Sequence, residues 1–166
     1  MKKTIFIFLA ILVVFITTSC SGSVVPTPSP VTNNPYSFSL PSLDGNVYSL
    51  SDFEGRVVVL YYFKLNCSYC SQLLPTVLQL SKEYEDVVFL IVNYRDSISE
   101  ITPYISQYQV DIPVLLDSDG KYAAKLGIYA FPTTVIFNPD GSLDSKIIGA
   151  VPEAKLRQKI DAAITN

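Results

Sequence analysis

Two continuous apolar runs place the strongest constraint on how this chain can fold. Residues 57–63 (VVVLYYF) and 87–92 (VVFLIV) are made of β-branched, aromatic and leucine residues, a composition typical of strands buried on both faces of a sheet. Between them, residues 71–84 carry apolar side chains at helical spacing. The runs therefore predict a strand–helix–strand unit at the centre of an α/β domain.

The rest of the chain from Tyr36 onward extends this unit on both sides. The pattern predicts a hairpin over 38–50 around the turn Asp44-Gly45-Asn46, a turn at 51–55 and a helix over 97–108. It then predicts an extended segment at 113–116, a helix at 121–126, strands at 133–137 and 143–148 joined by a tight turn, and a helix over 152–164. This order is typical of a three-layer α/β/α fold with a mixed central sheet.

The first 35 residues have a different composition. The 12 apolar residues at 5–16 follow a basic start, and such a helix spans about 18 Å, short of the ~30 Å hydrocarbon core. This predicts a signal peptide over 1–19, with an uncleaved N-terminal anchor as the alternative. Thr18-Ser19-Cys20 resembles the lipobox of bacterial lipoproteins, although Thr17 stands where leucine is usual. That resemblance implies that Cys20 is lipidated and that residues 20–35 form a flexible tether to a domain at 36–166.

Two of the three cysteines, Cys67 and Cys70, form a CxxC pair at the predicted start of a helix. Free N–H groups and the positive end of the helix dipole stabilise a thiolate there, which lowers the pKa of Cys67. Cys70 lies one turn later on the same face, so the geometry predicts that Cys67 attacks and Cys70 resolves. Lys64 is expected to be a solvated residue of the preceding loop.

The composition argues against several other uses of the CxxC pair. The chain has no histidine, which excludes covalent haem attachment and removes the usual partner of cysteine in a zinc site. Its only methionine is Met1, which counts against a copper site. We therefore expect no metal and no cofactor. A purely structural disulfide remains open, although so short a loop gains little stability from it.

Charge argues against a nucleic-acid partner. A chain beginning at Cys20 loses Lys2 and Lys3, which leaves 10 basic against 15 acidic residues and a formal net charge of −5. Phosphate backbones are bound by clusters of lysine and arginine, and the sequence contains no such cluster. We expect no nucleic-acid binding.

Taken together, the motifs resemble those of the thioredoxin superfamily, in particular its membrane-attached TlpA/ResA-like branch. The resemblance covers Tyr36 to the C-terminus, with 93–120 as the inserted helix and strand of this branch. It rests on the following segments: 50–56 (LSDFEGR), the pair Cys67/Cys70, Pro75, Phe131-Pro132-Thr133 and Asn138-Pro139-Asp140-Gly141.

The resemblance implies an exported, membrane-anchored thiol–disulfide oxidoreductase that reduces protein disulfides. Cys67 and Cys70 would form the redox disulfide, with Ser68, Tyr69 and Pro75 supporting it. Pro132 would follow a cis peptide bond and pack against the disulfide, and Phe131 would pair with an extended substrate peptide. A CcdA/DsbD-type membrane protein would supply electrons, and apocytochrome c is a plausible substrate.

Three positions depart from the family pattern. Asn66 replaces the usual tryptophan, Tyr61 the buried aspartate of thioredoxins, and Leu73 the glutamate of ResA-type relatives. Since burial without a partner raises the pKa of a thiol, we expect Cys70 to be hard to deprotonate. Asp96 could approach it from the loop after the second strand, or be an exposed turn residue.

Two alternatives remain beside the reductase. A peroxidase-like relative would need Thr/Ser-x-x-Cys and a supporting arginine, which 64–66 does not supply. A non-enzymatic thioredoxin-fold binding module would keep the CxxC pair as a structural bridge.

Overall fold

The computed structural model describes residues 34–166. The predicted signal peptide over 1–19, the lipidation of Cys20 and nearly all of the tether over 20–35 lie outside the described residues. The side chain of Asn34 donates to the carbonyl of Gly141 at 2.8 Å and accepts from the Tyr36 N–H at 2.8 Å. Contacts with the domain therefore begin at least two residues before Tyr36.

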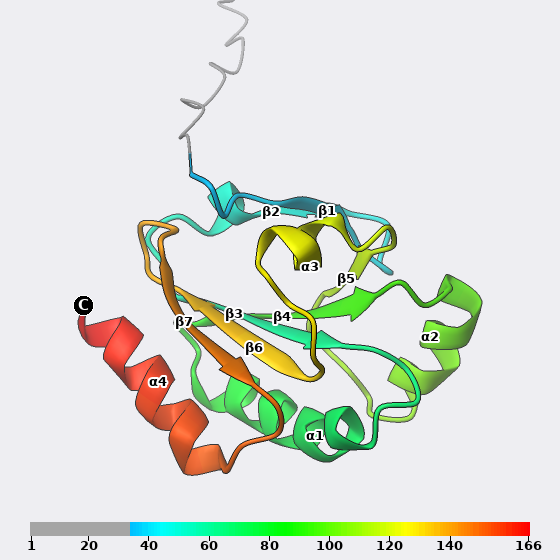
Figure 1. Cartoon of the computed structure of the whole chain (residues 1–166). Coiled ribbons are helices and arrows are strands. Elements are labelled where there is room, and N and C mark those ends of the chain that lie inside the picture. Colours follow the sequence, from blue (N-terminus) through cyan, green and yellow to red (C-terminus); the bar gives the residue numbers. More distant parts are fainter. Residues whose placement is uncertain (1–33) are drawn as a thin grey trace, which may run out of the picture. The chain divides into compact units, whose positions relative to one another are not determined.

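The core of the domain is a five-stranded mixed sheet with the strand order β5-β4-β3-β6-β7 (Figure 1). β3 pairs in parallel with β4 and antiparallel with β6. β5 continues the parallel half and β7 the antiparallel half. The bounds are β3 Val58–Phe63, β4 Val88–Tyr94, β5 Val114–Asp117, β6 Thr133–Phe137 and β7 Leu143–Ile148. The predicted mixed sheet is confirmed.

Helices and a hairpin cover the two faces of this sheet (Figure 1). α1 (Ser68–Glu83), α2 (Ile98–Ser106) and α4 (Glu153–Thr165) pack on one face. The other face is covered by α3 (Lys121–Lys125) and by the hairpin of β1 (Ser39–Pro41) and β2 (Val47–Ser49), with the 3-10 helix η1 (Leu50–Phe53). The predicted three layers are confirmed. In the layer that contains α3, the β1–β2 hairpin covers much of the sheet in place of further helices.

The alternation of β3 side chains explains why its run is apolar throughout. Val59, Tyr61 and Phe63 join the core beneath α1, α2 and α4, whereas Val58, Leu60 and Tyr62 join the core beneath α3 and the hairpin. All are at most 2% exposed. β3 is thus buried on both faces and directs the chain into α1 at the edge of the sheet where β3, β4 and β5 end.

Element boundaries differ from the predicted ones by a few residues. α1 begins at Ser68, before the apolar periodicity starts at 71, because Cys67 caps it. β4 continues to Tyr94 because Asn93 and Tyr94 still pair with Leu116 and Asp117. The predicted turn at 51–55 is largely the one-turn helix η1.

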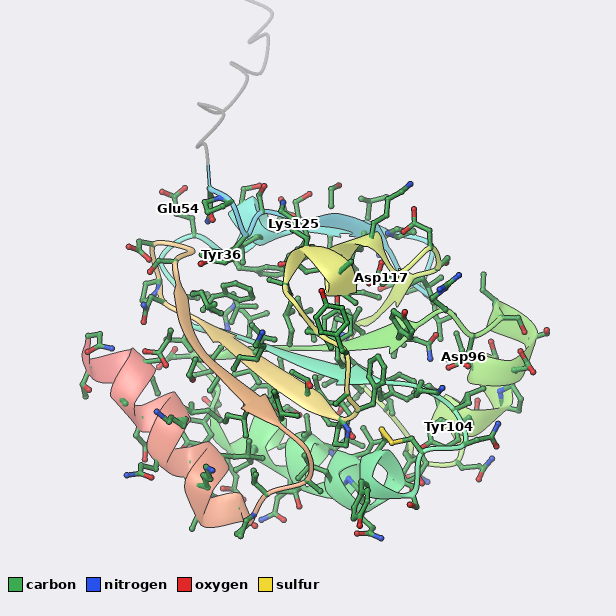
Figure 2. All side chains as sticks on the ribbon, in the orientation of Figure 1. Tyr36, Glu54, Asp96, Tyr104, Asp117 and Lys125 are labelled. Atoms are coloured by element: carbon green, nitrogen blue, oxygen red, sulfur yellow. A yellow bond between two sulfur atoms is a disulfide. The ribbon has the colours of Figure 1, made fainter. Side chains whose placement is uncertain are left out.

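A buried carboxylate fastens α3 to the end of β5. Asp117 is 1% exposed, and its oxygens accept from the N–H groups of Ala123 at 2.7 Å and Tyr122 at 3.2 Å. The hydroxyl of Tyr62 lies 3.4 Å from the same carboxylate, on the α3 side of the sheet (Figure 2). Asp117 therefore satisfies N–H groups in the first turn of α3 that have no partner within the helix.

Replacing this carboxylate should destabilise the fold strongly. We expect Asp117→Ala to lower the free energy of unfolding by about 2–4 kcal/mol, since hydrogen bonds to a buried charged group are lost and buried donors are left unpaired. Urea unfolding followed by circular dichroism measures the change. Asp111→Ala is the matched control: Asp111 forms only an exposed ion pair with Lys82 at 3.7 Å, and its loss should change stability little. Equal losses in the two variants would contradict this role of Asp117.

Candidate active site

The two predicted redox cysteines form a disulfide at the N-terminus of α1. Cys67 and Cys70 have Cα atoms 5.2 Å apart. Cys67 is the N-cap of the helix, and its sulfur accepts a hydrogen bond from the Cys70 N–H at 3.2 Å. Figure 2 shows the disulfide as a yellow bond at the start of α1. The pair therefore lies where backbone N–H groups favour a negative charge on the first sulfur.

The two sulfurs differ in their access to solvent. Cys70 is fully buried, whereas Cys67 is half-buried and lines a surface groove. A substrate disulfide must reach the attacking sulfur, so this difference favours Cys67 as the nucleophile and Cys70 as the resolving cysteine.

The linker 64–66 between β3 and Cys67 is held by a carboxylate from the next loop. Asp96 accepts hydrogen bonds from the Leu65 N–H and from the Asn93 side chain, both at 2.8 Å. Asn66, which stands in the position of the family tryptophan, has a φ of 57°, in the left-handed region that asparagine tolerates better than most residues. Asp96 is half-buried and holds the main chain ahead of Cys67, a role that the sequence alone does not reveal.

The segment before β6 has the predicted backbone. The Phe131–Pro132 peptide bond is cis. The Pro132 carbonyl accepts from the Gly149 N–H at 2.7 Å, and the Thr133 hydroxyl donates to the Ala130 carbonyl at 2.7 Å. The Phe131 ring packs on Tyr94 and also contacts the apolar cluster to which both cysteines belong. That Pro132 packs on the disulfide stays a prediction.

The groove beside Cys67 has a volume of about 820 Å³ and lies between the start of α1 and α2. Asn66, Cys67 and Ser71 line one side, and Pro103 and Tyr104 line the other. This wall was not predicted, because the family resemblance places α2 only within an inserted segment. The helical spacing of residues 97–108 could not show which face of α2 lies toward the cysteines.

The position of Tyr104 in this groove is set by aromatic stacking. Its ring stacks on Phe63, with centroids 5.7 Å apart and planes 16° apart. Desolvation by burial, with Tyr108 as a further cause, raises the pKa of the Tyr104 hydroxyl, which stays protonated at neutral pH. Figure 2 shows Tyr104 on the same side of the domain as the disulfide.

At the two positions where the family pattern predicts an acid, the structure has buried side chains without a carboxylate. Leu73 is 4% exposed and belongs to the core beneath α1. Tyr61 is fully buried, and its hydroxyl donates to the carbonyl of Cys70 at 2.7 Å. The substitution at Tyr61 is visible in the sequence, but this contact depends on how α1 packs on the sheet.

The remaining predicted support residues all belong to α1. Ser68 is its first residue, and the Ser68 carbonyl accepts from the Ser71 hydroxyl at 2.8 Å. Tyr69 is 62% exposed beside the pair, and Pro75 is an exposed residue inside the helix. Among residues 34–166, no three histidine, cysteine, aspartate or glutamate side chains gather closely enough to hold a metal ion.

Comparison with known proteins agrees with this site. The family model described as "AhpC/TSA family" matches residues 31–146. The chain belongs to the AhpC/TSA family. It is 30% identical over 128 residues to the thioredoxin-like protein YneN of Bacillus subtilis, covering 75% of each chain. It is 26% identical over 121 residues to the thiol-disulfide oxidoreductase ResA of the same organism, covering 72% of this chain and 68% of ResA.

A solved structure supports the same assignment. The pneumococcal exposed lipoprotein thioredoxin Etrx1 from Streptococcus pneumoniae superposes with a TM-score of 0.70 at 28% identity, covering 76% of this chain and 98% of Etrx1. The fold, the relatives and the disulfide together make this chain a ResA-like thiol–disulfide oxidoreductase of the thioredoxin superfamily. The predicted family and type of enzyme are confirmed.

The contact of Asp96 with the linker should matter for the reactivity of Cys67. We expect Asp96→Ala to slow alkylation of Cys67 by iodoacetamide in the reduced protein about fivefold to tenfold, because a charge-assisted hydrogen bond that positions the linker is lost. Mass spectrometry of the modified peptide measures the rate.

Asp96→Asn is the control for charge, because its amide oxygen can still accept from the Leu65 N–H. We expect it to react within about twofold of the unmodified protein, since the hydrogen bond that positions the linker is kept. If Asp96→Ala alkylates as fast as the unmodified protein, the positioning role is wrong.

Proposed function

We propose that this protein is an exported, membrane-tethered reductase of protein disulfides. The observation that carries the proposal is the Cys67–Cys70 disulfide, with a half-exposed first sulfur at a helix N-terminus and a fully buried second one. A purely structural bridge would not require its first sulfur to line an open groove.

The reaction begins with the reduced pair. The Cys67 thiolate attacks one sulfur of a substrate disulfide, forms a mixed disulfide and releases the other substrate sulfur as a thiolate. Cys70 then gives up its proton and attacks the Cys67 sulfur. The Cys67–Cys70 bond forms, the bond to substrate breaks, and the departing substrate thiolate takes up the proton. Two electrons pass from the enzyme to the substrate.

The direction of exchange and the partners are inferred from resemblance to the ResA-like branch. An oxidised pair must be reduced again for each turnover, and in an oxidising compartment the electrons must come from elsewhere. A CcdA/DsbD-type membrane protein is the proposed donor, and apocytochrome c, whose haem-binding cysteines must be reduced, is the proposed substrate. Phe131 and Pro132 are proposed to bind the extended substrate chain beside the disulfide.

The proposed location is the outer face of the bacterial cytoplasmic membrane or the periplasm. It rests on the apolar segment and lipobox-like sequence ahead of Cys20. The name of Etrx1, an exposed lipoprotein thioredoxin, lends support from a similar protein. No helix among residues 34–166 is both long and apolar enough to cross a membrane. The proposed organisation is a signal peptide over 1–19, a lipidated tether over 20–35 and the redox domain over 36–166.

A trapping variant tests the proposed reaction. Cys70→Ser should accumulate mixed disulfides between Cys67 and substrate proteins, because the resolving thiol is missing. Non-reducing electrophoresis of cells expressing the variant, followed by mass spectrometry, detects them. Cys67→Ser/Cys70→Ser is the matched control and should form none. If Cys70→Ser forms no adducts and the unmodified protein does not reduce insulin disulfides, the chain is a binding module with a structural bridge.

A second variant tests the lipid anchor. Cys20→Ala should move the protein from the detergent phase to the aqueous phase in Triton X-114 partitioning, because two or more acyl chains are what hold a lipoprotein at a membrane. Ser21→Ala is the neighbouring control and should stay in the detergent phase. Unchanged partitioning of Cys20→Ala would show that the apolar segment itself anchors the chain.

A further inference from the structure

We propose that Tyr61 is a positioning residue for the resolving cysteine, in the place where thioredoxins carry a buried acid. Its hydroxyl holds the main chain of Cys70 and thereby sets the approach of the Cys70 sulfur to Cys67. It acts without exchanging a proton. This role belongs to the resolving step of thiol–disulfide exchange and is independent of the substrate or the anchor.

The hydrogen bond between Tyr61 and Cys70 joins two fully buried residues. Tyr61 lies in the middle of β3, is fully buried, and donates to the Cys70 carbonyl at 2.7 Å. Its ring is nearly parallel to that of Phe63, with centroids 6.5 Å apart and planes 4° apart. The hydroxyl therefore reaches α1 from a ring that the core holds in place, and it ties the first turn of the helix to the central strand.

Pro75 weakens α1 close to the hydrogen bond from Tyr61. A proline inside a helix has no N–H to donate to the carbonyl four residues earlier, here Ser71, and its ring pushes against that carbonyl. The first turn of α1, which carries both cysteines, is therefore bound less firmly to the rest of the helix. The bond from Tyr61 reaches the carbonyl of Cys70, the neighbour of Ser71, and so ties this turn to the central strand.

The surroundings of Cys70 provide no buried carboxylate for its proton. Asp117 is the one carboxylate among residues 34–166 that is fully buried, and it faces α3 on the other side of the sheet. The buried residues of α1 and α4 are apolar apart from Cys70 itself, and the one buried polar side chain of β4 is Asn93, which donates to Asp96. Thr134 of β6 pairs with Tyr61 of β3. It is 1% exposed, and its hydroxyl has no hydrogen-bond partner.

The charged groups near the site lie at its rim. Asp96 is half-buried and accepts hydrogen bonds from Leu65 and Asn93. Lys64 and Glu100 are exposed. Tyr61 itself cannot act as a base at neutral pH, because burial, with smaller effects of Tyr104 and Tyr108, raises the pKa of its hydroxyl well above the ordinary value. The hydroxyl is therefore protonated and donates to the Cys70 carbonyl.

The test separates attack from resolution. The reduced protein reacts with 5,5′-dithiobis(2-nitrobenzoate) in two phases: attack by Cys67 releases one coloured thiolate, and resolution by Cys70 releases the second. We expect Tyr61→Phe to slow the second phase about tenfold, in keeping with the loss of one buried hydrogen bond, and to leave the first phase within about twofold. The slowing should be equal at every pH, because Tyr61 exchanges no proton.

Tyr62→Phe is the matched control. Tyr62 is the next residue on β3 and equally buried, but its hydroxyl points to Asp117 on the opposite face. It should leave both phases unchanged, even where it lowers the melting temperature. The proposal is wrong if both variants slow the second phase alike, or if Tyr61→Phe leaves it unchanged. A slowing that disappears at high pH would instead show that Tyr61 handles the proton.

Discussion

The rest of the structure depends on the burial of β3 on both of its faces. This strand pairs with β4 on one side and β6 on the other, so its backbone polar groups are satisfied by neighbours and its side chains can all be apolar or aromatic. One set of side chains forms the core beneath α1, α2 and α4, and the other forms the core beneath α3 and the hairpin. Since the chain leaves β3 directly into the linker before Cys67, the placement of the redox pair follows from where this strand ends.

The active site is assembled at one edge of the sheet from segments far apart in the sequence. β3 and β4 end there, and the loops that follow them meet where Asp96 bonds to Leu65. β6 begins at the same edge, which brings the cis-proline segment there. The ends of parallel strands commonly position ligands and reactive groups in this way. Here the edge presents a half-exposed sulfur, and the core behind it contains a second, buried sulfur.

The two positions where the family pattern has an acid near the buried cysteine are filled here by Tyr61 and Leu73. Tyr61 contributes a donor, Leu73 contributes only apolar surface, and the half-buried Asp96 bonds to the linker ahead of Cys67. A neutral hydroxyl costs far less to bury than a carboxylate, because an unpaired charge in a core carries a large desolvation penalty. The core beneath α1 thus contains a neutral hydroxyl in place of a carboxylate, and Cys70 must lose its proton without a buried carboxylate beside it.

Much of the fold and part of the site could be predicted from the sequence. Continuous apolar runs reveal buried strands, helical spacing reveals α1, α2 and α4, and Cys67-Ser68-Tyr69-Cys70 together with Phe131-Pro132 identifies the redox pair and the cis bond, because each of these signals is local. The contacts of Asp96 with Leu65, of Tyr104 with the groove and of Tyr61 with Cys70 join residues from different elements. Only the packing of α1 and α2 on the sheet decides them, since side-chain distances between elements depend on how the layers are stacked and not on spacing along the chain.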